Sequence, residues 1–278
     1  MLLNQFYVDD IIKNAICEDI NYLDVTTDYL IDDEQQSSAY FLAKDSGVLA
    51  GIEVALRVFS LLDSNVKYDI LINDGSKVQN GDIIAKIEGK TRALLKGERT
   101  ALNLLQHMSG IATKTAKCVE LVAGTNAAVC DTRKTLPGLR ALQKYAVICG
   151  GGKNHRYNLS DAAMLKDNHI DAYGSITNAV LALRKKAGHM VKIEVETRNL
   201  QELQEALDVK ADVIMLDNMD YDTMKEAVKI TNGRAFLEAS GNVTEDNIRD
   251  VALCGVDIIS LGALTHSVKA FDISMKIK

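Results

Sequence analysis

The sequence predicts an α/β protein built from two modules, an N-terminal α+β module followed by a β/α barrel. Two observations predict this. Up to about residue 90 short strand and helix patterns are mixed, whereas from about residue 127 short apolar runs alternate regularly with helical stretches. Such alternation indicates parallel strands joined by crossover helices. With 278 residues, 47% of them hydrophobic, the chain can form one large domain or two.

The elements of the first module are short. We expect helices at residues 8–18 and 52–62, and strands at 38–43, 48–50 and 66–72. Thr27 or Asp28 is expected to cap a further helix.

Residues 73–89 contain two glycine turns between alternating apolar residues, which predicts hairpin-like strands. The segment resembles the sandwich of lipoyl and biotinyl carrier domains. It lacks the lysine motif at the hairpin tip that those carriers modify, so we expect it to be structural.

A long helix is expected from Thr91 to about Val122, as a connector between the modules, with Ser109-Gly110 as a point where it could bend or break. Beyond it the expected strands are 127–130, 163–165, 191–195, 213–216, 235–239 and 258–261, and the expected helices are 139–148, 176–187, 200–207, 221–230 and 244–254.

Polar or small residues follow each predicted strand of the second module. They are Asp131-Thr132-Arg133-Lys134, Lys166-Asp167-Asn168-His169, Glu196-Thr197-Arg198, Asp217-Asn218, Ser240-Gly241-Asn242 and Gly262-Ala263. In a β/α barrel these positions share one rim, where active sites lie. A doubly wound sheet is the rival fold, but it would normally have a glycine-rich turn after its first strand, and residues 131–134 are not one.

Five of the polar residues in this region are cationic or carry a titratable proton, namely Arg133, Lys134, His155, Arg156 and Lys166. The whole chain has a formal net charge of -6, so this cluster runs against the average. Such a cluster favours a small polyanionic ligand. Any one of these residues could simply pair with a nearby acid, but five together favour a binding site. The lack of Trp and the 5% aromatic content argue against nucleic acid.

Two carboxylates, Glu196 and Asp217, end the middle strands. Carboxylates that face an anion are unfavourable unless a cationic or hydroxyl group lies between the carboxylates and the anion. Ribose hydroxyls, Mg²⁺ or a developing oxocarbenium charge would each serve, and the sequence does not choose among these. Glu194 lies on the same side of its strand as Glu196, so either could face the site.

The small residues of Ser240-Gly241 and Gly262-Ala263 would let backbone N–H groups approach a phosphate, although they could also form ordinary tight turns. The histidines lack zinc-site spacing.

Residues 1–6 have no basic region followed by an apolar one, and no apolar stretch approaches about 20 residues, so we expect neither a signal peptide nor a membrane span. The five cysteines are scattered and lack CxxC spacing. This pattern favours reduced thiols in a cytoplasmic protein.

Several long runs closely resemble the quinolinate phosphoribosyltransferase family over nearly the whole chain. They are Asp131-Thr132-Arg133-Lys134-Thr135, Pro137-Gly138-Leu139-Arg140, Gly150-Gly151-Gly152, Asn154-His155-Arg156-Tyr157, Lys166-Asp167-Asn168-His169, Glu194-Val195-Glu196, Leu216-Asp217-Asn218, Glu238-Ala239-Ser240-Gly241-Asn242 and Gly262-Ala263-Leu264-Thr265-His266-Ser267. Leu136 and Asn158 depart from the common Thr and Gly of the family, without removing a charged group.

The resemblance implies an open β/α barrel of the type II phosphoribosyltransferase kind, at residues 111–278, behind an N-terminal α/β sandwich with its connecting helix at 1–110. The last few residues could return to the first domain. It implies transfer of phosphoribosyl from phosphoribosyl pyrophosphate to quinolinate with decarboxylation, aided by Mg²⁺. It also implies a cytoplasmic homodimer with shared active sites, a hexamer remaining open.

The resemblance also assigns roles to residues. The dicarboxylate would be held by Arg99, Arg133, Lys134, His155, Arg156 and Lys166, and the ribose and Mg²⁺ by Glu196 and Asp217. The 5′-phosphate would be held by Ser240, Gly241 and Gly262, with further substrate contacts from Thr132, Asn242, Ala263 and His266. Lys134, Lys166, Glu196 and Asp217 would be catalytic, with no covalent nucleophile.

Two alternatives stay open. A phosphoribosyltransferase-like protein of molybdenum-transport gene clusters shares the Asp-Thr-Arg-Lys and Gly-Gly-Gly runs. A non-catalytic phosphosugar-binding barrel would share the rim but not the chemistry.

Overall fold

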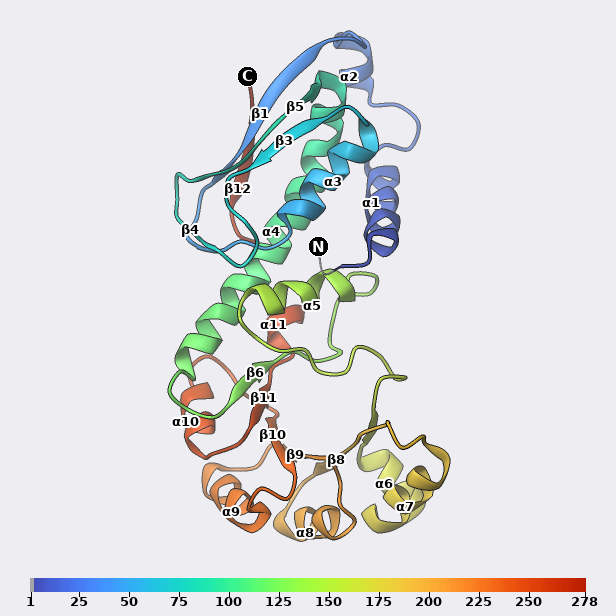
Figure 1. Ribbon diagram of the computed structural model, residues 1–278, viewed down its shortest axis with the longest axis vertical. Coiled ribbons are helices and arrows are strands. Elements are labelled where there is room, and N and C mark those ends of the chain that lie inside the picture. The colour runs from blue at the N-terminus through green and yellow to red at the C-terminus, as the bar shows by residue number, and fades with distance from the viewer. Residues whose placement is uncertain (1–2) are drawn as a thin grey trace. The chain divides into compact units, whose positions relative to one another are not determined.

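The computed structural model describes residues 3–278, which form two compact units (Figure 1). Unit 1 takes in the chain up to residue 116 together with 135–151 and 264–278, and unit 2 takes in 117–134 and 152–263. The chain therefore leaves unit 1 and returns to it twice. In the part of the chain that the structure describes, no helix is both long and apolar enough to cross a membrane.

Unit 1 is built on a four-stranded antiparallel sheet. Its strands, in spatial order, are β12 (Ile273–Ile277), β1 (Gln36–Ala43), β5 (Ile83–Lys90) and β3 (Lys67–Ile70). The C-terminal strand thus pairs with the first strand of the chain. Phe41 on the sheet meets Phe59 edge-to-face, with ring centroids 6.1 Å apart, and both rings are fully buried.

Three helices of unit 1 precede the long connector. They are α1 (Gln5–Asp19), α2 (Val25–Leu30) and α3 (Ile52–Leu62), and the predicted helices at 8–18 and 52–62 are confirmed. The predicted cap of α2 is wrong, because Thr27 and Asp28 lie inside the helix. The cap is Asp24, whose carboxylate accepts the backbone N–H groups of Thr26 and Thr27.

The hairpin predicted at residues 73–89 is also wrong. Its two strands, β4 (Lys77–Val78) and β5, have different partners. β4 pairs with β2 (Gly47–Val48), while β5 pairs with β1 and β3. Apolar alternation identifies which residues form strands, but the pairing is decided by contacts distant in sequence.

The long helix α4 (Thr91–Leu121) is confirmed and runs unbroken past Ser109-Gly110. Both residues instead serve close packing. The Ser109 hydroxyl hydrogen-bonds to the backbone N and O of Ala50. A Cβ on Gly110 would lie 2.2 Å from the carbonyl oxygen of Lys269, so only glycine allows this approach. Two shorter helices, α5 (Arg140–Cys149) and α11 (Ala263–His266), follow later in the chain.

Unit 2 contains a six-stranded, entirely parallel sheet. In spatial order its strands are β6 (Ala128–Cys130), β11 (Ile258–Ser260), β10 (Phe236–Ser240), β9 (Val213–Asp217), β8 (Ile193–Thr197) and β7 (Ala163–Leu165). Every predicted strand is confirmed to within a few residues. Because β6 and β7 lie at the two edges, the barrel is open, and the doubly wound alternative is excluded by this strand order.

The helices of unit 2 follow the strands around the outside of the curved sheet (Figure 1). They are α6 (Asp167–Tyr173), α7 (Ile176–Lys186), α8 (Leu200–Asp208), α9 (Tyr221–Thr231) and α10 (Ile248–Leu253). α6 was not expected, and α10 begins later than predicted because residues 245–247 form a turn.

Candidate active site

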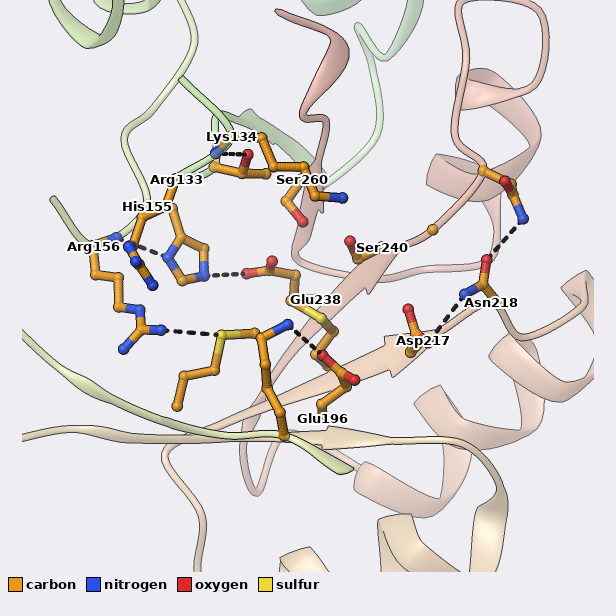
Figure 2. A pocket seen from close by; sticks show the side chains of 16 residues that line it. Arg133, Lys134, His155, Arg156, Glu196, Asp217, Asn218, Glu238, Ser240 and Ser260 are labelled. Atoms are coloured by element: carbon orange, nitrogen blue, oxygen red, sulfur yellow. Dashed lines mark hydrogen bonds and ion pairs between the residues drawn. The ribbon is translucent and has the colours of Figure 1, made fainter. Parts of the chain in front are cut away.

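A cavity of about 570 Å³ opens at the carboxyl ends of the parallel strands in unit 2 (Figure 2). It is lined by Thr132, Arg133, Lys134, His155, Arg156, Met164, Lys166, Glu196, Met215, Asp217, Asn218, Glu238, Ser240, Gly241, Asn242 and Ser260. Predicted rim residues from five of the six strands therefore meet in one place, and Ser260 of β11 joins them, as a β/α barrel requires.

Asp131 holds two parts of the cationic side together. Its side chain is fully buried, and its two oxygens accept the backbone N–H of His155 at 2.9 Å and the side-chain amide of Asn154 at 2.5 Å. Cys130 and Lys153 form a parallel bridge beside it. Residues more than 20 positions apart, Arg133 and Arg156 among them, consequently line the same wall.

The Arg156 side chain is anchored before any ligand arrives. Its guanidinium donates to the backbone carbonyl of Ala162 at 2.9 Å and contacts Sδ of Met164 at 3.7 Å. Burial lowers the pKa of Arg156, and the nearby charge of Arg133 acts in the same direction. An arginine remains charged under such an influence, so the two guanidinium groups repel each other. A bound anion would relieve that repulsion.

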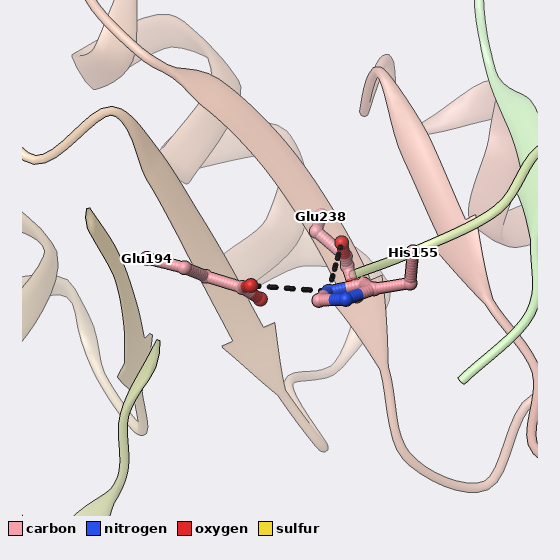
Figure 3. Close-up of side chains that lie close together, drawn as sticks. All are labelled: His155, Glu194 and Glu238. Carbon is pink, nitrogen blue, oxygen red and sulfur yellow. Dashed lines mark ion pairs between the residues drawn. The ribbon is translucent and has the colours of Figure 1, made fainter. Parts of the chain in front are cut away.

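His155 lies against two buried carboxylates (Figure 3). Its Nε2 is 3.0 Å from Oε2 of Glu194 and 3.5 Å from Oε2 of Glu238, whose side chains are 7% and 2% exposed. Its Nδ1 accepts the backbone N–H of Arg156 at 2.8 Å. Because a backbone amide can only donate, Nδ1 carries no proton and the ring proton is on Nε2.

Burial and neighbouring charges shift the pKa values of two of these side chains, His155 and Glu194. Burial lowers the pKa of His155, but the hydrogen bonds and charges of Glu194 and Glu238 outweigh it and raise that pKa above its usual value. Burial, opposed by His155 and assisted by Glu238, raises the pKa of Glu194. A second ring proton on Nδ1 would point at the N–H of Arg156, so the hydrogen bond at Nδ1 opposes full protonation of the ring.

Opposite the cations lie carboxylate and amide groups on neighbouring strands. Glu196 lies one residue before the end of β8, and its Oε2 accepts a hydrogen bond from Nζ of Lys166 at 3.1 Å. Asp217 ends β9, and its Oδ2 accepts the side-chain amide of Asn218 at 3.0 Å. Asn218 in turn accepts the side-chain amide of Asn242 at 2.9 Å. The chain of amides therefore joins the end of β10 to the carboxylate of Asp217.

The loop after β10 has a backbone that demands a small residue. Gly241 has φ of 90°, and a Cβ there would lie 2.3 Å from Oδ1 of Asn218. Asn218 and Asn242 are themselves left-handed, with φ of 54° and 51°. Together with Ser240 they form a polar, small-residue end of the cavity.

Four predicted site residues are not among those lining this cavity. Gly262 and Ala263 follow β11 in unit 2, and His266 and Arg99 belong to unit 1. His266 Nδ1 lies 2.7 Å from the hydroxyl of Ser267. Arg99 is exposed and lines a separate pocket with Glu18, Asp19, Asn103 and neighbouring residues.

Glu238 was quoted in a motif but given no role, and Glu194 and Glu196 could not be told apart by sequence. The structure puts Glu196 on the cavity wall and Glu194 beneath His155. The available signal was alternation. Glu194 lies two residues before Glu196, and Glu238 lies two residues before Ser240, so each pair of side chains lies on the same face of its strand.

Two sets of side chains in this region could be considered as ligands for a metal ion, and they differ in their ability to bind one. The ligand atoms of His155, Glu194 and Glu238 lie within 4.8 Å of one another, but Nε2 of His155 carries the ring proton and cannot coordinate a cation. Glu196 and Asp217 offer carboxylate oxygens at the cavity itself, which fit a hard cation such as Mg²⁺.

Two family models match the chain. The model described as the N-terminal domain of quinolinate phosphoribosyl transferase covers residues 24–109, and the model of its C-terminal domain covers residues 111–276.

Individual proteins agree with the family models. The chain is 45% identical over 275 residues to a probable nicotinate-nucleotide pyrophosphorylase [carboxylating] of Bacillus subtilis, covering 99% of this chain and 95% of that protein. It is 42% identical to a chloroplastic Arabidopsis thaliana protein of the same name, with 96% and 82% covered. The crystal structure of NadC from Streptococcus pyogenes superposes with a TM-score of 0.97 at 43% identity, covering 100% and 99%.

Proposed function

The chain belongs to the quinolinate phosphoribosyltransferase family, and from that premise we propose how its cavity performs the reaction. The enzyme transfers phosphoribosyl from phosphoribosyl pyrophosphate to quinolinate with loss of a carboxyl group, giving nicotinate mononucleotide, pyrophosphate and CO₂. The observation that carries the residue assignments is the separation of charge in one cavity, with cations along one wall and carboxylates and small residues along the other (Figure 2).

Quinolinate binds along the cationic wall. Arg133 and Arg156 present planar guanidinium groups that match carboxylates in a bidentate manner, and Lys166 adds a point charge. The mutual repulsion of the arginines favours a ligand with two carboxylates over one with a single carboxylate. Thr132, Lys134 and His155 complete this wall.

The phosphoribosyl group binds beside the carboxylates of the opposite wall. Glu196 and Asp217 face the ribose and offset the positive charge that develops on it as pyrophosphate leaves. The small-residue end at Ser240, Gly241 and Asn242 receives the 5′-phosphate, with Gly262 and Ala263, which follow β11 in the same unit, as further contacts. Glu196 and Asp217 would also hold Mg²⁺, which neutralises pyrophosphate charge when bound.

The chemistry requires positioning and electrostatics more than a nucleophile. The ring nitrogen of quinolinate attacks the anomeric carbon while the bond to pyrophosphate breaks. The C–CO₂ bond at the adjacent carbon then breaks, its electron pair stays on that carbon, and one proton is added there. Lys134 and Lys166 are the cavity amines available as its donor, which is why we assign them catalytic roles.

We also propose a homodimer with shared sites, in which Arg99 of one chain reaches the cavity of the other. Arg99 is exposed on α4, in a pocket lined by acidic Glu18 and Asp19, and a cation there would extend the dicarboxylate site of a partner. The five cysteines are scattered along the sequence without CxxC spacing, which supports a reducing compartment, and we place the protein in the cytoplasm.

The reaction is tested by following pyrophosphate release with quinolinate, with nicotinate and without a pyridine acid, each with and without Mg²⁺. Quinolinate alone should support release, because nicotinate lacks the second carboxylate, and chelation should suppress it. Equal rates with nicotinate would refute the dicarboxylate site. Tight binding of phosphoribosyl pyrophosphate without turnover would instead support a non-catalytic sugar-phosphate barrel.

A further inference from the structure

We propose that Glu194 and Glu238 are positioning residues for the quinolinate half of the site, fixing the His155 ring so that it aligns the backbone of Arg156. This inference rests on the proposed function, because it concerns how Arg156 is held ready for quinolinate. Neither glutamate was assigned a role by the sequence motifs, and both are buried, so neither acts as a surface charge.

The first observation is that burying the two carboxylates beside each other is energetically unfavourable. Glu194 and Glu238 are 6% and 1% exposed, and Oε1 of each is buried with no hydrogen-bond partner among residues 3–278. Burying two carboxylates side by side is unfavourable unless something in the fold compensates. Their shared contact is Nε2 of His155, which both approach through Oε2.

The second observation is what the other edge of the ring does. Nδ1 of His155 accepts the N–H of Arg156 at 2.8 Å, while the N–H of His155 is held by Asp131. The ring is thus fixed at both nitrogens, and the peptide carrying the Arg156 side chain is fixed by the ring. The Arg156 guanidinium needs only the contacts to Ala162 and Met164 to point along the cavity wall.

The direction of the hydrogen bonds matters. Two acceptors at Nε2 require a donor there, and one backbone donor at Nδ1 requires an acceptor, so only the Nε2–H tautomer satisfies both edges. If the glutamates were replaced by apolar residues, the ring could take its other tautomer or turn over. Either change would remove the acceptor from the Arg156 N–H.

The wild-type protein tests the tautomer directly. Nitrogen-15 NMR of the histidine rings, with the His155 signals identified by their loss in His155→Gln, should show a protonated Nε2 and an unprotonated Nδ1 at neutral pH. A proton on Nδ1, in either the other tautomer or the imidazolium form, would overturn the proposal without any need for a glutamate variant.

The variants test the consequence. Glu238→Leu and Glu194→Leu should raise the quinolinate KM about ten- to a hundredfold and leave the KM for phosphoribosyl pyrophosphate within about twofold. Glu238→Gln should restore quinolinate KM to within about threefold, since its amide oxygen accepts from Nε2 while its NH₂ faces Glu194. Asp257→Leu is the matched control, because Asp257 accepts the N–H of Leu237 on the same strand but does not line the cavity.

Two comparisons separate this inference from the proposed function. If Arg156→Ala leaves quinolinate KM unchanged, the assignment of the dicarboxylate wall fails. If Arg156→Ala raises it but the leucine variants behave like Asp257→Leu, the wall stands and the positioning role is wrong. A leucine variant that does not fold is replaced by the NMR measurement on Glu238→Gln, in which the Nε2–H signal must persist.

Discussion

Nζ of Lys166 lies 3.1 Å from Oε2 of Glu196, so a cation of the cationic wall is paired directly with a carboxylate of the opposite wall. Lys166 follows β7 and Glu196 lies on the neighbouring strand β8. The Lys166 side chain is 49% exposed and that of Glu196 is 15% exposed, so the pair is partly screened by water. Lys166 is therefore shared between Glu196 and any carboxylate that binds beside it.

Glu196→Gln should lower kcat while leaving quinolinate KM unchanged or lowering it. The substitution removes the charge that we propose faces the ribose, and it also releases Lys166 to bind a quinolinate carboxylate. Steady-state kinetics in both substrates would measure this. A rise in quinolinate KM with unchanged kcat would contradict the division of the cavity into two walls.

Arg156→Ala should raise quinolinate KM or abolish turnover. One charge-assisted contact is worth about 1.5–3 kcal/mol, which corresponds to roughly ten- to a hundredfold in affinity. Arg198→Ala is the matched control, since Arg198 is an exposed arginine of unit 2 whose partner is Glu202. Unchanged quinolinate kinetics in a folded Arg156→Ala protein would remove this residue from the site.

Asp217→Asn should depress kcat by about a hundredfold, the scale of losing one preorganised electrostatic contact, with little change in quinolinate KM. The geometry should survive, because the remaining side-chain oxygen can still accept the amide of Asn218. Stopped-time product assays at saturating substrate would report the loss. If only quinolinate affinity changed, Asp217 would belong to the opposite wall.

Asn218→Gly should weaken use of phosphoribosyl pyrophosphate while changing the free energy of unfolding by less than about 1 kcal/mol. Glycine tolerates the φ of 54°, so the variant removes the amide that holds Asp217 without straining the backbone.

Gly241→Ala provides the complementary measurement. Its new Cβ would collide with Oδ1 of Asn218 and the backbone would be strained by about 1–3 kcal/mol. In the Asn218→Gly background the collision disappears and only the strain remains. The two substitutions should therefore be non-additive in thermal unfolding, and simple additivity would show that they do not touch.

The sequence predicted the location of the cavity more reliably than the contacts within it. Parallel strands bring their carboxyl ends to one edge, so Lys166, Glu196 and Asp217 had to approach one another once the strands were recognised. The role of Asp131 as a clamp between two segments could not be read this way, because Asn154 lies 23 positions further along the chain.

The same limit explains the errors in unit 1. The strand residues of 73–89 were recognisable, yet β4 pairs with β2 and β5 with β1, and nothing local encodes those choices. Asp24 and Thr27 are both good capping residues, and the backbone conformation that selects Asp24 is visible only in the fold. Glu238 looked like an ordinary strand residue until His155 was found beside it.

The last prediction concerns Arg99, which lies in unit 1, outside the residues that line the cavity of unit 2. If dimers share sites, Arg99→Ala and Arg133→Ala should each be inactive alone, because every site lacks one cation. A heterodimer of the two would contain one site with both cations intact and one with neither.

Mixing the two variants, unfolding and refolding them should therefore restore activity. With random pairing about half of the dimers are mixed and each has one intact site of two, so roughly a quarter of all sites should work. Refolding each variant alone is the control and should yield none. Heterodimers shown to form by differential tagging, yet devoid of activity, would mean that Arg99 does not act across the interface, and the cation of the dicarboxylate site would then have to be sought within the same chain.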